Sequence, residues 1–139
     1  MKIAICDDEK IFLKKMNNLI VSNYANPDKL IICEFESGEQ FLSQFKANQF
    51  DVIILDIEMK ELTGLDVAEK IRETDKAVII AFLTSHQEFA PNGYEVNAFR
   101  YLLKSDIPYK LIPYFVNSLQ EVINSRQTVT FSISGESID

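Results

Sequence analysis

Five side chains that could act together on a phosphate group each come directly after a short apolar run. The runs, with the residues that follow them, are Ile3–Cys6 before Asp7 and Asp8, Val52–Leu55 before Asp56, Ala77–Leu83 before Thr84, and Ala98–Leu103 before Lys104. Three carboxylates brought together repel one another unless a cation lies among them. Mg²⁺ binds carboxylate, water and phosphate oxygens. With a lysine and a hydroxyl nearby, this set favours phosphoryl transfer, in which one carboxylate can form an aspartyl phosphate.

The elements that would position these side chains alternate along the chain. The four runs and Leu30–Cys33 predict strands that are buried on both faces, as in a parallel sheet covered by helices. Between them, apolar residues recur at helical spacing, and Ser37 and Thr63 have the form of helix N-caps. The alternation predicts an α/β fold with a doubly wound five-stranded parallel sheet. Ligands of such folds bind beyond the carboxyl ends of the strands, where the five polar side chains are expected.

Length, charge and cysteine content narrow the class of protein. The 139 residues support one domain, and 47% hydrophobic residues are enough for a core. A net charge of -7, from 14 basic and 21 acidic residues, argues against nucleic-acid or anionic-membrane binding by this piece. Cys6 and Cys33 are expected to be buried, reduced thiols. No signal peptide or membrane-spanning run is visible, so we expect a cytoplasmic protein that does not bind membranes.

The pattern changes near the end of the chain. Beyond Ser125, apolar Val129, Phe131 and Ile133 alternate with polar residues, which predicts a strand. We therefore expect one domain over residues 1–125, and over 126–139 a linker and the first strand of a truncated C-terminal domain. The segment Gln87–Glu95 is ambiguous, and its proline and glycine favour a short or mobile helix.

Five segments together resemble the receiver domain of a bacterial two-component response regulator. They are Ile3–Glu9, Asp51–Met59, Leu62–Leu65, Leu83–Ser85 and Tyr101–Lys104, and the resemblance runs from Met1 to about Asn124 in order and spacing. It implies a flavodoxin-like (βα)5 fold with strand order 2-1-3-4-5. It also implies that the protein takes a phosphoryl group from a sensor histidine kinase with Mg²⁺ as the metal. Such a domain is not a classical enzyme, although it assists its own phosphorylation and dephosphorylation.

The resemblance assigns a role to each matching position of this sequence. It implies Asp56 as the phosphoacceptor, Asp8 as a direct Mg²⁺ ligand, Asp7 as a ligand through water, the backbone carbonyl of Glu58 as a further ligand, Thr84 and Lys104 as the catalytic groups that contact the phosphoryl group, and Thr84 with Tyr101 as the switch. No organic cofactor is implied. One position departs from the family, in which the lysine is followed by proline, often through a cis bond. Here Ser105 follows Lys104, so we expect either a trans bond with an altered loop or a strained bond.

A narrower resemblance concerns the output. The segments Phe82–His86 and Tyr94–Lys104 resemble receivers that are fused to LytTR-type DNA-binding domains. This implies control of transcription, with DNA bound only by the missing C-terminal domain. The wide apolar set of the last helix, which includes Ile112 and Val116, either broadens the core contact or forms a homodimer surface.

Two other functions remain open from the sequence. A small phosphatase of the haloacid-dehalogenase type also uses an aspartate nucleophile with Mg²⁺, and Asp56-Ile57-Glu58 faintly resembles its signature. That family places its nucleophile after the first strand, and no cap domain fits in this length. A pseudo-receiver would bind a partner without being phosphorylated. The intact set of site residues argues against it, whereas Ser105 argues mildly for it.

Overall fold

The computed structural model describes residues 1–85, 96–106 and 111–138 and shows strands alternating with helices. Its elements, in chain order, are β1 (Lys2–Cys6), α1 (Lys10–Asn23), the 3-10 helix η1 (Pro27–Lys29), β2 (Ile31–Phe35), α2 (Gly38–Gln44), β3 (Val52–Asp56), α3 (Gly64–Thr74), β4 (Ile79–Thr84), β5 (Arg100–Leu103), the 3-10 helix η3 (Lys104–Asp106) and α4 (Leu111–Ile138). The helix expected over Gln87–Glu95 lies outside the described residues.

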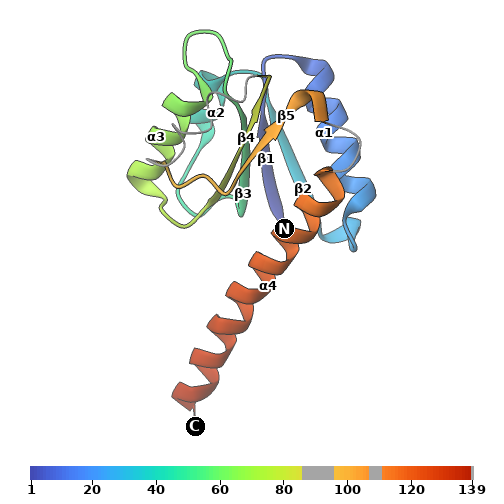
Figure 1. The fold of residues 1–139 in the computed structure, drawn as a ribbon. Helices are drawn as coiled ribbons and strands as arrows, with labels where there is room; N and C mark the ends of the chain where they lie inside the picture. The colour runs from blue at the N-terminus through green and yellow to red at the C-terminus, as the bar shows by residue number, and fades with distance from the viewer. Residues whose placement is uncertain (86–95, 107–110, 139) are drawn as a thin grey trace.

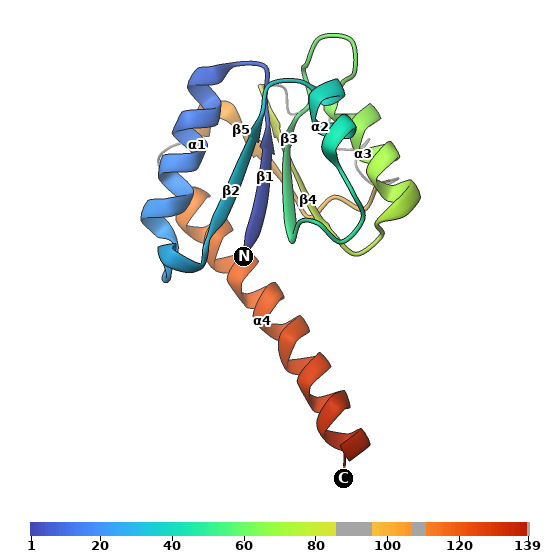
Figure 2. The same ribbon diagram turned by 180° about the vertical axis from the view of Figure 1, so that it is seen from behind.

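The five strands form one parallel sheet in the order β2-β1-β3-β4-β5, which confirms the predicted topology. Helices α1 and α4 cover one face, and α2 and α3 cover the other (Figures 1 and 2). Because every strand runs the same way, the carboxyl ends of β1, β3, β4 and β5 meet at one edge. The described ranges contain no helix that is both long and apolar enough to cross a membrane.

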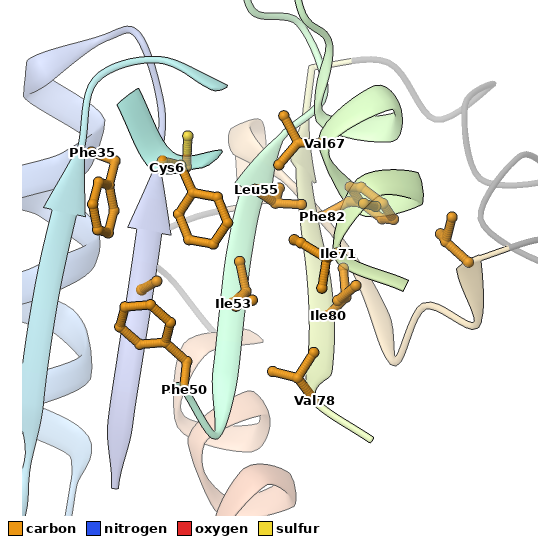
Figure 3. Close-up of a cluster of buried hydrophobic side chains, with 14 of the residues drawn as sticks. Cys6, Phe35, Phe50, Ile53, Leu55, Val67, Ile71, Val78, Ile80 and Phe82 are labelled. Carbon is orange, nitrogen blue, oxygen red and sulfur yellow. The ribbon is translucent and has the colours of Figure 1, made fainter. Parts of the chain in front are cut away.

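Each face of the sheet carries its own apolar core. Under α1 and α4 the core is built from residues such as Ile5, Met16 and Phe115. Under α2 and α3, Figure 3 shows Ile53 and Leu55 of β3 packed with Phe82 of β4 and with α3 side chains. The central strands are buried on both faces, as predicted. The two edge strands, β2 and β5, are not. Ile31 of β2 is 57% exposed, and of the four β5 residues only Leu102 is buried.

Both cysteines are free thiols, but Cys33, on the edge strand β2, is only partly buried. Cys6 is buried at the end of β1, where its Sγ lies 3.6 Å from the sulfur of Met59. Burial raises the pKa of the Cys6 thiol to about 12, with a smaller contribution from the nearby Asp7. The thiol is therefore protonated at neutral pH and takes part in packing.

The last helix corrects the strand predicted from Val129, Phe131 and Ile133. Helix α4 continues through these positions to Ile138 and extends past the sheet (Figure 1). A strand needs a partner for its backbone hydrogen bonds, whereas a helix satisfies them within the segment. The alternating pattern alone did not decide the conformation. Closer to the sheet, Ile112 and Val116 are 0% and 1% exposed, so they broaden the core contact, and Tyr114 is the exposed apolar residue of this turn.

The amino ends of β4 and β5 are joined by one arginine. Arg72 of α3 donates hydrogen bonds to the carbonyl oxygens of Val96 (2.7 Å), Val78 (2.8 Å), Asp75 (3.2 Å) and Asn97 (3.3 Å). The Asp75 carboxylate accepts from the backbone N–H groups of Ala77 and Val78. This Arg72 cluster fixes the chain that enters β4 and β5 against α3, at the end of the sheet opposite the predicted site.

Candidate functional site

A buried lysine lies between two buried carboxylates at the carboxyl edge of the sheet. Asp7 follows β1, Asp56 ends β3, and Lys104 follows β5; they are 0%, 1% and 6% exposed. The ammonium nitrogen of Lys104 lies 3.0 Å from Asp7 Oδ2 and 3.4 Å from Asp56 Oδ2. The parallel sheet thus brings together groups that lie as many as 97 positions apart in the sequence.

The electrostatics of this group favour a further cation. Burial and, to a smaller extent, the charge of Asp7 raise the pKa of Asp56 from 3.8 to about 7, against the lowering effect of Lys104. Burial likewise raises the pKa of Asp7, against a hydrogen bond from the Glu9 N–H and the nearby Lys104. For Lys104, burial alone would lower the pKa, but the contact with Asp7 and the charge of Asp56 raise it overall. One ammonium therefore does not fully compensate the two buried carboxylates.

The carboxylates also have oxygen atoms available for a metal ion. Oδ2 of Asp7 and Oδ2 of Asp56 are buried, and neither accepts a well-directed hydrogen bond, although both form an ion pair with Lys104. Asp8, the most exposed of the three aspartates, adds a third carboxylate, and one oxygen from each of the three lies within 4.8 Å of the others. Hard oxygen donors at this spacing fit Mg²⁺.

The remaining predicted residues border this group. Thr84 ends β4, is 1% exposed and is paired in register with Leu103, the residue before Lys104. The Glu58 N–H donates to Asp56 Oδ1 at 3.3 Å, and the Glu58 carboxylate accepts from the Ser85 N–H at 3.4 Å. The sheet therefore places Thr84 and Glu58 next to the carboxylates that the sequence grouped with them.

Tyr101 lies on β5 beside Phe82 of β4. The two rings are stacked, with centroids 5.3 Å apart, and the Tyr101 hydroxyl oxygen is buried. Its ring therefore borders the apolar core under α2 and α3 rather than the carboxylates.

A glycine brings the start of α3 close to the phosphoacceptor position. Thr63 caps α3 by accepting from the Asp66 N–H, and the Asp66 carboxylate accepts from the Thr63 N–H, which completes a capping box. A Cβ atom on Gly64 would lie 2.3 Å from the Asp56 carbonyl oxygen, closer than any real contact. The sequence identified the cap but gave no sign of this close approach, which depends on how α3 packs on β3.

Two further contacts of Lys104 were not predicted. Its ammonium lies 3.1 Å from Glu9 Oε1, and 4.3 Å from the centre of the Phe12 ring on α1. By its spacing, Phe12 belongs to the apolar stripe of α1. An aromatic residue one turn after the acidic pair is the sequence signal that could have suggested the contact.

The residues after Lys104 form the 3-10 helix η3, which includes Ser105 and Asp106. The altered loop expected from the missing proline is consistent with this turn. The bond between Lys104 and Ser105 stays a prediction.

The chain is similar to known proteins over most of its length. Residues 3–113 match the response regulator receiver domain. The sensory transduction protein LytR of Staphylococcus epidermidis is 36% identical over 104 residues, which are 75% of this chain and 40% of that protein. The transcriptional regulatory protein LytR of Staphylococcus aureus is 29% identical over 106 residues, 75% of this chain and 41% of that protein. The chain thus spans less than half the length of these relatives.

Solved structures agree with the fold. The response regulator TrrA of Thermotoga maritima, solved in complex with Mg²⁺ and BeF, superposes with a TM-score of 0.71 at 28% identity. The match covers 85% of this chain and 97% of that one. The similarity to LytR proteins confirms the prediction from the sequence that the receiver is of the LytTR-associated type.

Proposed function

The chain belongs to the family of response regulator receiver domains, and we propose that its Asp56 accepts a phosphoryl group from the phosphohistidine of a sensor histidine kinase. The observation that carries this is the buried ion-paired group of Asp7, Asp56 and Lys104 at the edge of the sheet, next to Asp8. A Mg²⁺ ion held by Asp7, Asp8, Asp56 and the Glu58 carbonyl would neutralise charge on the carboxylates and on the phosphoryl oxygens.

In the proposed step, an oxygen of the Asp56 carboxylate attacks phosphorus. The P–O bond forms as the P–N bond to the donor imidazole breaks, and the imidazole nitrogen keeps the electron pair and takes a proton from solvent. Lys104 and Thr84 donate hydrogen bonds to the phosphoryl oxygens. Water later cleaves the acyl phosphate, which releases inorganic phosphate and restores Asp56, and the same groups assist this hydrolysis.

The phosphoryl group adds about -1.5 to -2 charge and three acceptors at the site. We propose that Thr84 moves toward these acceptors, that Tyr101 moves with it, and that the face around β5 and α4 changes its affinity for a partner, a second copy included. In a longer protein, a LytTR-type domain C-terminal to α4 would bind DNA and control transcription. The name of the Staphylococcus aureus relative, a transcriptional regulatory protein, supports this output.

Intact mass spectrometry after incubation with acetyl phosphate and Mg²⁺ tests the proposal. We expect one added phosphoryl group, lost in Asp56→Asn and retained in Asp28→Asn, which changes an exposed aspartate of η1. Labelling that persists in Asp56→Asn would refute the assignment. Repeated turnover of a phosphate ester would instead indicate a phosphatase, and no labelling at any donor concentration would indicate a pseudo-receiver.

A further inference from the structure

The position of the Lys104 ammonium depends on more than the site carboxylates. Lysine carries a compact charge on a flexible four-carbon stem, so its location is set by what surrounds the ammonium. Besides Asp7 and Asp56, the ammonium contacts Glu9, which is the N-cap of α1, and the ring of Phe12 in α1. The two α1 contacts differ in kind, since one is a charge and the other is an aromatic face.

Glu9 is a replaceable contact. Its side chain is 55% exposed, and its carboxylate occupies an N–H donor of Lys104 at 3.1 Å. An incoming anion that needs that donor must displace Glu9 or share the ammonium with it. Water can solvate the released carboxylate, so the exchange leaves no buried charge behind.

Phe12 holds the ammonium without occupying a hydrogen-bond donor. The distance of 4.3 Å from Nζ to the ring centre lies well inside the range of a cation–π contact. Helix α1 fixes the backbone from which the ring projects, because the Phe12 N–H donates to the Glu9 carbonyl and the next residue, Leu13, is buried in the core. The ring can therefore attract the ammonium both before and after a phosphoryl group arrives.

We propose that Phe12 is a positioning residue, which holds Lys104 by a cation–π contact so that its N–H donors face the phosphoryl group on Asp56. The proposal rests on the function proposed above. Because the ring acts on Lys104 and supplies no oxygen ligand for Mg²⁺, its removal should weaken binding of a phosphoryl group and leave metal binding intact. This separation distinguishes a positioning role from a general structural one.

The test uses beryllofluoride, which stands in for the phosphoryl group, and isothermal titration calorimetry at saturating Mg²⁺. Phe12→Leu keeps an apolar side chain but loses the aromatic face, and Phe12→Tyr keeps the face. We expect Phe12→Leu to weaken beryllofluoride binding about five- to tenfold, Phe12→Tyr to stay within about twofold of the original protein, and the Mg²⁺ affinity to stay within about twofold in both.

Lys15→Gln is the matched control, because the Lys15 ammonium also lies over the Phe12 ring, 5.6 Å from its centre. It should leave beryllofluoride affinity unchanged, and circular dichroism should show every variant folded. Unchanged binding in Phe12→Leu overturns the inference. So does an equal loss in Phe12→Tyr, or a parallel loss of Mg²⁺ affinity. If the original protein binds no beryllofluoride, or if Lys104→Met binds it equally well, the proposed function itself has failed.

Discussion

Replacing Asp56 by asparagine should stabilise the metal-free protein, although it removes the residue proposed to react. Asp56 is 1% exposed, and burial together with the Asp7 charge raises its pKa from 3.8 to about 7. That change corresponds to roughly 4 kcal/mol of folding free energy lost when the carboxyl group is ionised. Asparagine keeps the shape without the charge but leaves Lys104 with one fewer partner, so we expect a net gain of about 2 kcal/mol.

The stability gained by Asp56→Asn should depend on pH. A carboxyl group whose pKa is raised by folding stabilises the native state while it is protonated, so its contribution is lost as pH rises from about 4 to about 7. The advantage of Asp56→Asn should be near zero at about pH 4 and complete above about pH 7. It should appear as a rise of roughly 6 °C in melting temperature, measured by circular dichroism in EDTA.

Magnesium should reverse the order of stability at neutral pH. Millimolar Mg²⁺ is expected to raise the melting temperature of the original protein more than that of the variant, because the variant lacks one metal-binding carboxylate. Asp28→Asn should behave like the original protein throughout. A lower melting temperature for Asp56→Asn in EDTA at neutral pH, or an advantage independent of pH, would refute the argument from buried like charge.

Three other changes have expected outcomes. Gly64→Ala places a Cβ 2.3 Å from the Asp56 carbonyl oxygen, so α3 must shift; chemical unfolding should show a loss of about 2 kcal/mol or more. No loss, or the small gain typical of a Gly→Ala change in an exposed helix, would contradict the close approach. Arg72→Lys cannot reach four carbonyl oxygens and should lose about 2–3 kcal/mol in urea unfolding, whereas Lys70→Arg, an exposed change on the same helix, should be neutral. Lys104→Met leaves Asp7 and Asp56 uncompensated, so its melting temperature should fall more at about pH 8 than at about pH 5; equal losses at both would contradict the coupling.

The sequence predicted the sheet and the residues at its edge because both depend on simple rules. Runs such as Val52–Leu55 are apolar throughout, and strands buried on both faces need that composition. The parallel sheet then carries the residue after each run to the same edge, so Asp7, Asp56 and Lys104 meet without further information. The helix caps at Ser37 and Thr63 follow from local hydrogen bonding alone.

What the sequence did not predict depends on packing between elements. The alternation around Phe131 indicated a strand, but a strand requires a partner and the structure continues the helix. Phe12 fits the apolar spacing of α1, and its contact with Lys104 arises only when β5 and α1 are placed together. In the same way, Arg72 contacts the carbonyls of Val78, before β4, and Val96, before β5, only because of the position of α3.

The Arg72 cluster gives the β4–β5 pair two ends of unequal stiffness. At the amino ends, the carbonyls of Val78 and Asn97 are tied to one guanidinium, whereas at the carboxyl end of β5 Lys104 is held through its flexible side chain, by ion pairs with Asp7 and Asp56. We therefore expect a displacement introduced at Thr84 to diminish toward the amino ends, where the Arg72 hydrogen bonds resist it. Amide hydrogen exchange should record this as slow exchange near Ile79 in every state, with faster opening confined to the residues around Thr84.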